Sequence, residues 1–138
     1  MRRARSILLV EDNPADSMLV RKALEEHGFS GELTVVDNGE TAIHRIQSLD
    51  REALAECPDL VIIDLSLPRK SGREVLEIMR RCEKCRHTPV VILSSSDAVQ
   101  DKADAARLGA SRYIRKPSRL EEFLKLGATF KEIIEAGS

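Results

Sequence analysis

The sequence predicts an α/β fold in which helices cover both faces of one parallel sheet. Apolar runs typical of buried strands alternate along the chain with amphipathic stretches at the three- and four-residue spacing of helices. Helix-capping and turn residues separate the two kinds of segment, for example at Asn13-Pro14, Asn38-Gly39 and Pro89. Short connections between strand and helix favour right-handed crossovers, which place helices on both faces.

The apolar runs predict five strands. These lie near Ile7–Val10, Leu33–Val36, Leu60–Ile63, Val90–Leu93 and Arg112–Ile114. The run from Leu60 to Ile63 is apolar throughout, which is typical of a strand that is buried on both faces.

Helices are predicted between the strands and after the last one. Their apolar stripes are Leu19, Ala23 and Leu24; Ile43, Ile46, Leu49 and Ala53; Val75, Leu76 and Met79; Ala103, Ala106 and Leu108; and Leu120, Phe123, Leu124, Phe130, Ile133 and Ile134. Gly28 and Gly109 stand where left-handed C-terminal caps belong.

The last predicted helix has more apolar side chains than a single stripe facing the sheet needs. We therefore expect a homodimer through the last two helices, the alternative being a long helix packed wholly on its own sheet.

Size and charge exclude several classes of function. A chain of 138 residues fits one domain, and 22 Lys plus Arg against 23 Asp plus Glu give a net charge of −1. This balance argues against nucleic-acid binding, and Arg2, Arg3 and Arg5 are interpreted as a solvated terminus. No apolar run approaches the length that spans a bilayer, so we expect no membrane association and a cytoplasmic protein.

The three cysteines, Cys57, Cys82 and Cys85, are expected to be free thiols in a reducing compartment. Cys82 and Cys85 are followed by His87, but a zinc site of this kind normally needs a second ligand pair. A thioredoxin-like role is also disfavoured, because these cysteines lie at the end of a predicted helix and not at its start.

Acidic residues follow two of the predicted strands. Glu11 and Asp12 follow the first strand, and Asp64 follows the third. Open parallel sheets place their chemistry at the carboxyl ends of strands, so the three carboxylates should lie close together. They would repel one another unless a cation lay among them, and carboxylate oxygens suit Mg²⁺. The sequence therefore predicts a magnesium site with Asp64 as a nucleophile.

Two more polar side chains reach the same edge of the sheet. Ser94 ends the fourth strand, and Lys116 follows the fifth. Phosphoryl transfer to a carboxylate needs these residue types, because a cation neutralises charge while Lys and a hydroxyl hold the phosphoryl oxygens.

With these residues in order, the chain resembles the receiver domain of two-component response regulators over essentially its whole length. The matching residues are Glu11-Asp12, Asp64 with Pro68, Ser94, Tyr113 and Lys116-Pro117. The resemblance implies a flavodoxin-like (βα)5 fold with sheet order 2-1-3-4-5. It implies a single receiver domain over residues 1–138 that ends in a long helix.

The resemblance also implies the role of each pocket residue. Asp64 would accept a phosphoryl group from a sensor histidine kinase, and the protein would catalyse its own phosphorylation and dephosphorylation without being a conventional enzyme. Glu11, Asp12, Asp64 and the backbone carbonyl of Ser66 would bind Mg²⁺. Ser94 and Lys116 would hold the phosphoryl group.

A switch is implied as well. Rotation of Ser94 toward the phosphoryl group would vacate space into which Tyr113 turns, and this would alter the face made by the fourth helix, fifth strand and fifth helix. The peptide bond between Lys116 and Pro117 would be cis.

Within this family, the chain looks like the single-domain regulators paired with bacterial phytochrome histidine kinases. The segments behind this are 10–16, 64–68, 72–76 and 91–96, together with the extended connection from Ser48 to Pro58. An unrelated kinase partner is equally compatible with the motifs.

Two other classes of function are considered. A haloacid-dehalogenase-type phosphatase also uses an Asp after an apolar strand, but it needs a second Asp two residues later, where this chain has Ser66. A phosphorylation-independent pseudo-receiver adaptor remains the main alternative, although such proteins usually lack an acid or the Lys of the pocket.

Overall fold

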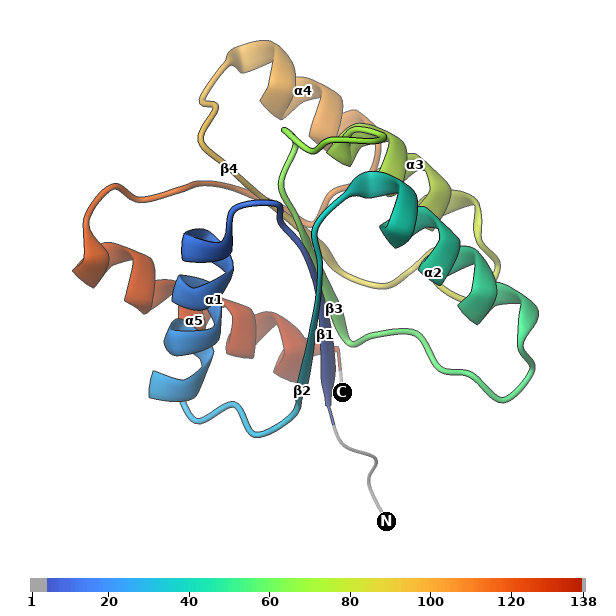
Figure 1. The fold of residues 1–138 in the computed structure, drawn as a ribbon, viewed down its shortest axis with the longest axis horizontal. Coiled ribbons are helices and arrows are strands. Elements are labelled where there is room, and N and C mark those ends of the chain that lie inside the picture. Colours follow the sequence, from blue (N-terminus) through green and yellow to red (C-terminus); the bar gives the residue numbers. More distant parts are fainter. Residues whose placement is uncertain (1–4, 138) are drawn as a thin grey trace.

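The computed structural model describes residues 5–137, which form alternating strands and helices (Figure 1). The strands are β1 (Ser6–Val10), β2 (Glu32–Val36), β3 (Leu60–Ile63), β4 (Val90–Ser94) and β5 (Arg112–Arg115). The helices are α1 (Pro14–Glu26), α2 (Gly39–Arg51), α3 (Gly72–Arg81), α4 (Val99–Arg107) and α5 (Leu120–Ala136). All strand pairs are parallel and the sheet order is β2-β1-β3-β4-β5, which confirms the predicted fold class and topology.

The sheet separates two hydrophobic cores. Helices α1 and α5 cover one face, and α2, α3 and α4 cover the other (Figure 1). Because side chains alternate across a strand, Ile7 and Leu9 pack on the α1 and α5 side while Leu8 and Val10 pack on the opposite side. The central strands are thus buried on both faces, and only their ends can carry polar groups toward solvent.

The helix caps lie where the sequence predicts them. The side chain of Asn13 accepts hydrogen bonds from the amides of Ala15 and Asp16, and Pro14 occupies the first helical position. Gly28 has φ +78° and Gly109 has φ +93°, the left-handed conformation that ends α1 and α4. The Asn13 cap fixes where α1 begins, and the two glycines fix where α1 and α4 end.

The predicted apolar stripe of the fourth helix is wrong at two of its three positions, although Leu108 packs against the core as predicted. Ala103 and Ala106 are exposed, whereas Asp104 and Ala105 face the interior. An acid takes an inner position because partners satisfy its carboxylate, among them Arg73 from α3 at 2.9 Å. The second helix is also shorter than predicted, since it ends at Arg51 and leaves Ala53 outside.

The expectation of three free thiols is wrong as well. Cys57 and Cys85 form a disulfide with their Cα atoms 5.7 Å apart, and Cys82 is a buried free thiol. The pairing joins the connection before β3 to the segment after α3, two loops separated by 28 residues that the fold places side by side. Lys84 reinforces this junction, because its ammonium donates to backbone carbonyls of Leu49, Glu52 and Ala55.

Helix α5 uses only part of its apolar surface against the rest of the molecule. Phe123, Phe130 and Ile134 are buried, and Gly127 lets the helix approach the backbone carbonyl of Ala23 in α1, where any Cβ would clash. Leu120, in the first turn, is 55% exposed.

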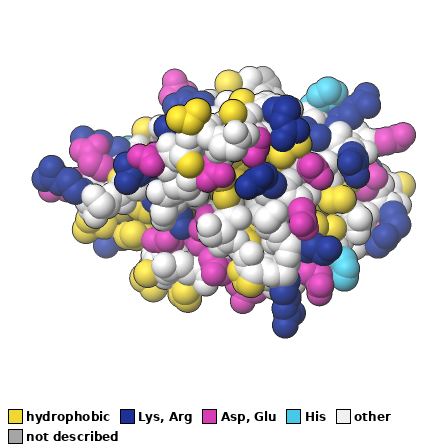
Figure 2. Space-filling model, turned by 90° about the horizontal axis from the view of Figure 1, so that it is seen from above, with side chains coloured by type: hydrophobic (Ala, Val, Ile, Leu, Met, Phe, Trp, Pro, Cys, Tyr) yellow, Lys and Arg dark blue, Asp and Glu magenta, His cyan; other side chains and the backbone are white. Residues whose placement is uncertain are grey.

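The molecular surface carries mixed charges. Figure 2 looks onto the edge of the molecule where the strands end, and acidic and basic side chains are interspersed on this face without a field of one sign. Arg5 pairs with Asp59 at 3.4 Å, while Arg2 and Arg3 lie outside the described residues. Among residues 5–137, no helix combines the length and apolar character needed to cross a membrane.

Candidate functional site

The register of the central strands brings three carboxylates together. Val10 of β1 pairs with Ile63 of β3, and the amide of Asp64 donates to the carbonyl of Val10 at 3.0 Å. Glu11, Asp12 and Asp64 therefore end neighbouring strands, and a ligand oxygen from each lies within 4.8 Å of the others. Glu11 and Asp64 are buried while Asp12 is exposed, so the cluster opens to solvent on one side.

The donor set fits a hard divalent cation. Mg²⁺ takes carboxylate oxygens together with waters, and a cluster with one exposed member leaves room for both. Ser66, the predicted fourth ligand through its carbonyl, lies beside the cluster and donates its amide to Asp64 Oδ1 at 3.1 Å. That hydrogen bond orients the Asp64 carboxylate toward the pocket.

Glycine allows the surrounding backbone to close on the acid. Gly72 begins α3, and a Cβ at this position would lie 2.3 Å from the backbone carbonyl oxygen of Asp64. The start of α3 can therefore pack directly against the Asp64 backbone, which any larger residue would push away.

Lys116 reaches the carboxylates from the end of β5, which β4 separates from β3. Its backbone amide donates to the Ser94 carbonyl at 2.7 Å, and its ammonium lies 2.8 Å from oxygens of Glu11, Asp16 and Asp64. The Lys116 side chain is 10% exposed, so the ion pairs are shielded from water. The structure thus brings together the Glu11, Asp64 and Lys116 side chains that the sequence named.

Asp16 was not recognised from the sequence as a pocket residue. It lies in the first turn of α1, where a carboxylate also interacts favourably with the helix dipole. The useful signal was that α1 begins at the same edge of the sheet as the acids, so a long enough side chain in its first turn can reach the pocket.

Burial and charge shift the pKa values of the paired groups. Burial raises the pKa of Glu11 to about 7, although hydrogen bonds from Lys116 and the Asn13 amide favour its charged form. Burial alone would lower the pKa of Lys116, but hydrogen bonds to Asp16, Asp64 and Glu11 outweigh it and raise that pKa above its ordinary value. Lys116 therefore stays an ammonium throughout the physiological range.

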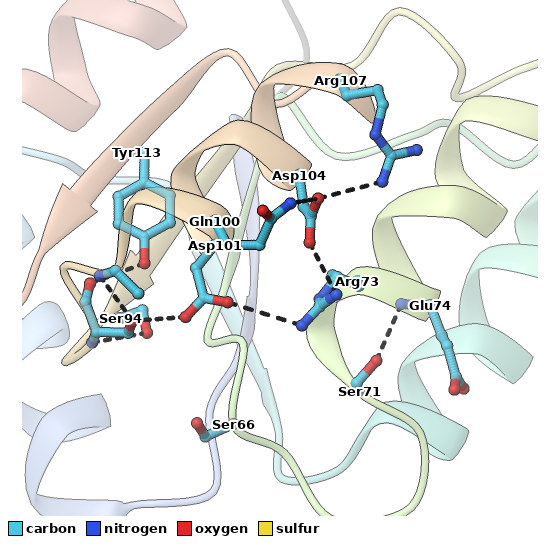
Figure 3. Close-up of polar contacts among 12 residues, drawn as sticks. Ser66, Ser71, Arg73, Glu74, Ser94, Gln100, Asp101, Asp104, Arg107 and Tyr113 are labelled. Atoms are coloured by element: carbon cyan, nitrogen blue, oxygen red, sulfur yellow. Dashed lines mark hydrogen bonds and ion pairs between the residues drawn. The ribbon is translucent and has the colours of Figure 1, made fainter.

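Ser94 and Tyr113, the predicted switch residues, meet at Ser96. Ser94 is buried at the end of β4, and its Oγ accepts a hydrogen bond from the Ser96 amide at 3.2 Å. The Tyr113 hydroxyl donates to the Ser96 carbonyl at 2.8 Å (Figure 3). Both side chains are thus tied to the loop between β4 and α4.

A polar network that the sequence did not predict extends from this loop to α3. The Ser96 hydroxyl donates to Asp101 at 2.5 Å, and Arg73 of α3 lies 3.7 Å from Asp101 and 2.9 Å from Asp104 (Figure 3). Arg73 is exposed and remote from these acids in sequence, so periodicity gave no sign of the contact. The network holds α4 against α3.

The predicted cis bond between Lys116 and Pro117 is wrong, because this peptide bond is trans. Trans is the lower-energy form of an X-Pro bond by about 0.5–1 kcal/mol. In the trans form, Lys116 already reaches its three carboxylates.

Comparison with known proteins agrees with this geometry. The response regulator receiver domain family model matches residues 7–127. The probable methanogenesis regulatory protein FilR2 of Methanothrix harundinacea is 35% identical over 126 residues, which cover 91% of this chain and 81% of that protein.

Two solved structures are also similar. The crystal structure of the phosphorylated cyanobacterial phytochrome response regulator RcpA has a TM-score of 0.87 and 32% identity, and the match covers 99% of this chain and 97% of that one. The Mn²⁺-bound form of response regulator Rcp1 has a TM-score of 0.82 and 31% identity, covering 93% and 92%. As a curated relative, Rcp1 comes from Synechocystis. The fold, the acidic cluster and these matches together show that the chain belongs to the response regulator receiver domain family.

Proposed function

We propose that this protein is a phosphorylation-switched component of a two-component system, in which Asp64 accepts a phosphoryl group from a sensor histidine kinase in a Mg²⁺-dependent reaction. The observation that carries the proposal is the position of Asp64. Its carboxylate lies 2.8 Å from the Lys116 ammonium and clusters with Glu11 and Asp12.

The chemistry follows from this arrangement. A carboxylate oxygen of Asp64 forms the new bond to phosphorus as the bond between phosphorus and the kinase imidazole nitrogen breaks, and that nitrogen takes up a proton. Lys116 and Ser94 bind the phosphoryl oxygens. Glu11, Asp12, Asp64 and the Ser66 carbonyl hold Mg²⁺, which when bound neutralises the charge on the transferred group.

The switch would act through the loop after β4. Rotation of Ser94 toward the phosphoryl group breaks its hydrogen bond with the Ser96 amide, and Tyr113 then gives up the Ser96 carbonyl to turn inward. These changes alter the face formed by α4, β5 and α5. Val99 and Leu120 are exposed apolar residues at the starts of α4 and α5, which supports homodimerisation through this face.

The partner is a sensor histidine kinase, and the similarity to the phytochrome response regulator RcpA makes a phytochrome kinase the first candidate. Because such a kinase draws on cytoplasmic ATP, the proposal also places the protein in the cytoplasm.

The alternative is an adaptor that works without phosphorylation. The full set of acids with Lys116 favours the switch over the adaptor, because an adaptor has no need to keep them.

Acetyl phosphate with Mg²⁺, followed by intact mass measurement, tests the proposal. We expect one added phosphoryl group in the wild type, none in Asp64→Asn, and none when a chelator removes Mg²⁺. Wild type that binds Mg²⁺ but gains no phosphoryl group, either from acetyl phosphate or from phosphorylated histidine kinases, would favour the adaptor.

A further inference from the structure

Asp16 lies in the pocket but belongs to neither the metal cluster nor the phosphoacceptor. It is in the first turn of α1, and its Oδ2 lies 2.8 Å from the Lys116 ammonium. The Asp16 side chain is 21% exposed and that of Lys116 is 10% exposed, so the pair is largely shielded from water. An ion pair in such a place is stronger than one on the open surface.

The other two partners of Lys116 are also predicted ligands of the cation. Glu11 and Asp64 each place an oxygen 2.8 Å from the same ammonium, and both belong to the acidic cluster. A divalent cation that binds there competes with Lys116 for these oxygens and repels its charge. Of the three carboxylates described around Lys116, Asp16 alone stands outside the cluster.

We propose that Asp16 is a positioning residue that holds the Lys116 ammonium when Mg²⁺ occupies the acidic cluster, and so makes metal binding compatible with a lysine in the pocket. The inference rests on the proposed function and extends it to a residue with no assigned role. Without the Asp16 carboxylate, Lys116 remains tied to Glu11 and Asp64, and the entering cation must displace an ammonium that has no other charged partner.

Calorimetric titration of the protein with Mg²⁺, in the absence of any phosphoryl donor, tests this proposal directly. We expect Asp16→Asn to bind Mg²⁺ roughly five- to tenfold more weakly than the wild type, because one carboxylate next to a shielded ammonium is lost. The matched control is Asp37→Asn. Asp37 borders the same hollow as Glu11 and Asp12, but its side chain is exposed and hydrogen-bonds to Asn38 and not to Lys116. We expect it to change affinity by less than about twofold, since exposed charges are screened.

A double-mutant cycle separates positioning from loss of charge. In a Lys116→Met background, the further change Asp16→Asn should weaken Mg²⁺ binding no more than Asp37→Asn does, because there is no ammonium left to hold. Equal affinity of wild type and Asp16→Asn would overturn the proposal, as would an undiminished effect of Asp16→Asn in the Lys116→Met background. Circular dichroism shows whether each variant is folded. Failure of the wild type itself to bind Mg²⁺ would overturn the proposed function, and this inference with it.

Discussion

At the scale of single residues, the energetics of the pocket depend on how its buried charges are neutralised. Glu11 is almost fully buried, yet it ends a strand beside another buried acid, Asp64. Lys116 offsets part of this cost, and the remainder appears as the raised pKa of Glu11. The pocket is therefore assembled at the expense of stability, which is common where a fold prepares a binding site.

The pH dependence of stability should report this cost. Because the pKa of Glu11 is about 7 in the folded protein and 4.5 ordinarily, the folded state retains a proton that the unfolded state has lost between these values. When a chelator keeps the protein free of metal ions, the free energy of unfolding should therefore fall by about 2–3 kcal/mol as pH rises from 4.5 to 7. Above pH 7 it should level off.

Urea unfolding of the wild type and of Glu11→Gln across this range measures the effect. Glutamine has nearly the same shape as glutamate but cannot titrate. The free energy of unfolding of the variant should therefore lack the fall of about 2–3 kcal/mol that we expect for the wild type. An equal decline in both proteins would assign the pH dependence to other groups.

At the scale of elements, connections outside the regular structure fix how helices sit on the sheet. Arg73 joins α3 to Asp101 and Asp104 of α4, and the bond between Cys57 and Cys85 joins the loops before β3 and after α3. The first contact lies next to the loop between β4 and α4, whereas the second lies at the opposite edge of the sheet. Phosphorylation should therefore affect the contact of Arg73 with α4 and leave the disulfide region unchanged.

The disulfide should contribute substantially to stability. Linking two residues separated by 28 positions restricts the unfolded chain by about 3.6 kcal/mol in the chain-entropy model. Reduction should therefore lower the Tm of the wild type by roughly 10 °C for a chain of this size.

Thermal unfolding with and without reductant, together with thiol counting, tests this prediction. Cys57→Ser should behave as the reduced wild type and be insensitive to reductant, while Cys82→Ala should remain sensitive. Three reactive thiols in denatured wild type prepared without reductant would show that the bond does not form.

At the scale of the whole molecule, helices cover both faces of the sheet. The exposed polar groups of the candidate site therefore lie at the carboxyl edge of the sheet. The acids, Lys116 and the loop between β4 and α4 all lie at this edge. Val99 and Leu120 begin helices at the same edge, and their side chains are 83% and 55% exposed. Leu54 is 97% exposed but lies on the loop before β3, at the opposite edge.

This placement gives a sharp test of dimerisation. With Mg²⁺ and beryllofluoride as a phosphoryl analogue, light scattering coupled to gel filtration should show a dimer of the wild type. Val99→Asp with Leu120→Asp should weaken the dimer by at least about tenfold, because burying unpaired carboxylates is costly. Leu54→Asp should dimerise as the wild type does. A monomeric wild type, or a dimer unaffected by the paired substitution, would remove α4 and α5 as the interface.

The fold was predictable because its signals are local. Four-residue apolar runs, an Asn-Pro cap and left-handed glycines each act within a few residues, and together they specify alternating strands and helices. The positions of Glu11, Asp12, Asp64, Ser94 and Lys116 followed, since the ends of parallel strands share one edge.

Only the tertiary structure decided which of these groups touch. Three contacts join residues that are far apart in sequence. They are the ion pair of Asp16 with Lys116, the ion pair of Arg73 with Asp104 of α4, and the disulfide between Cys57 and Cys85. Local rules do not predict the inner position of Asp104, because they assign a charged residue to solvent and carry no information about a partner on another helix. Sequence determined the elements and the edge at which chemistry occurs, whereas packing determined the pairings, since contact energies depend on distances that chain spacing does not encode.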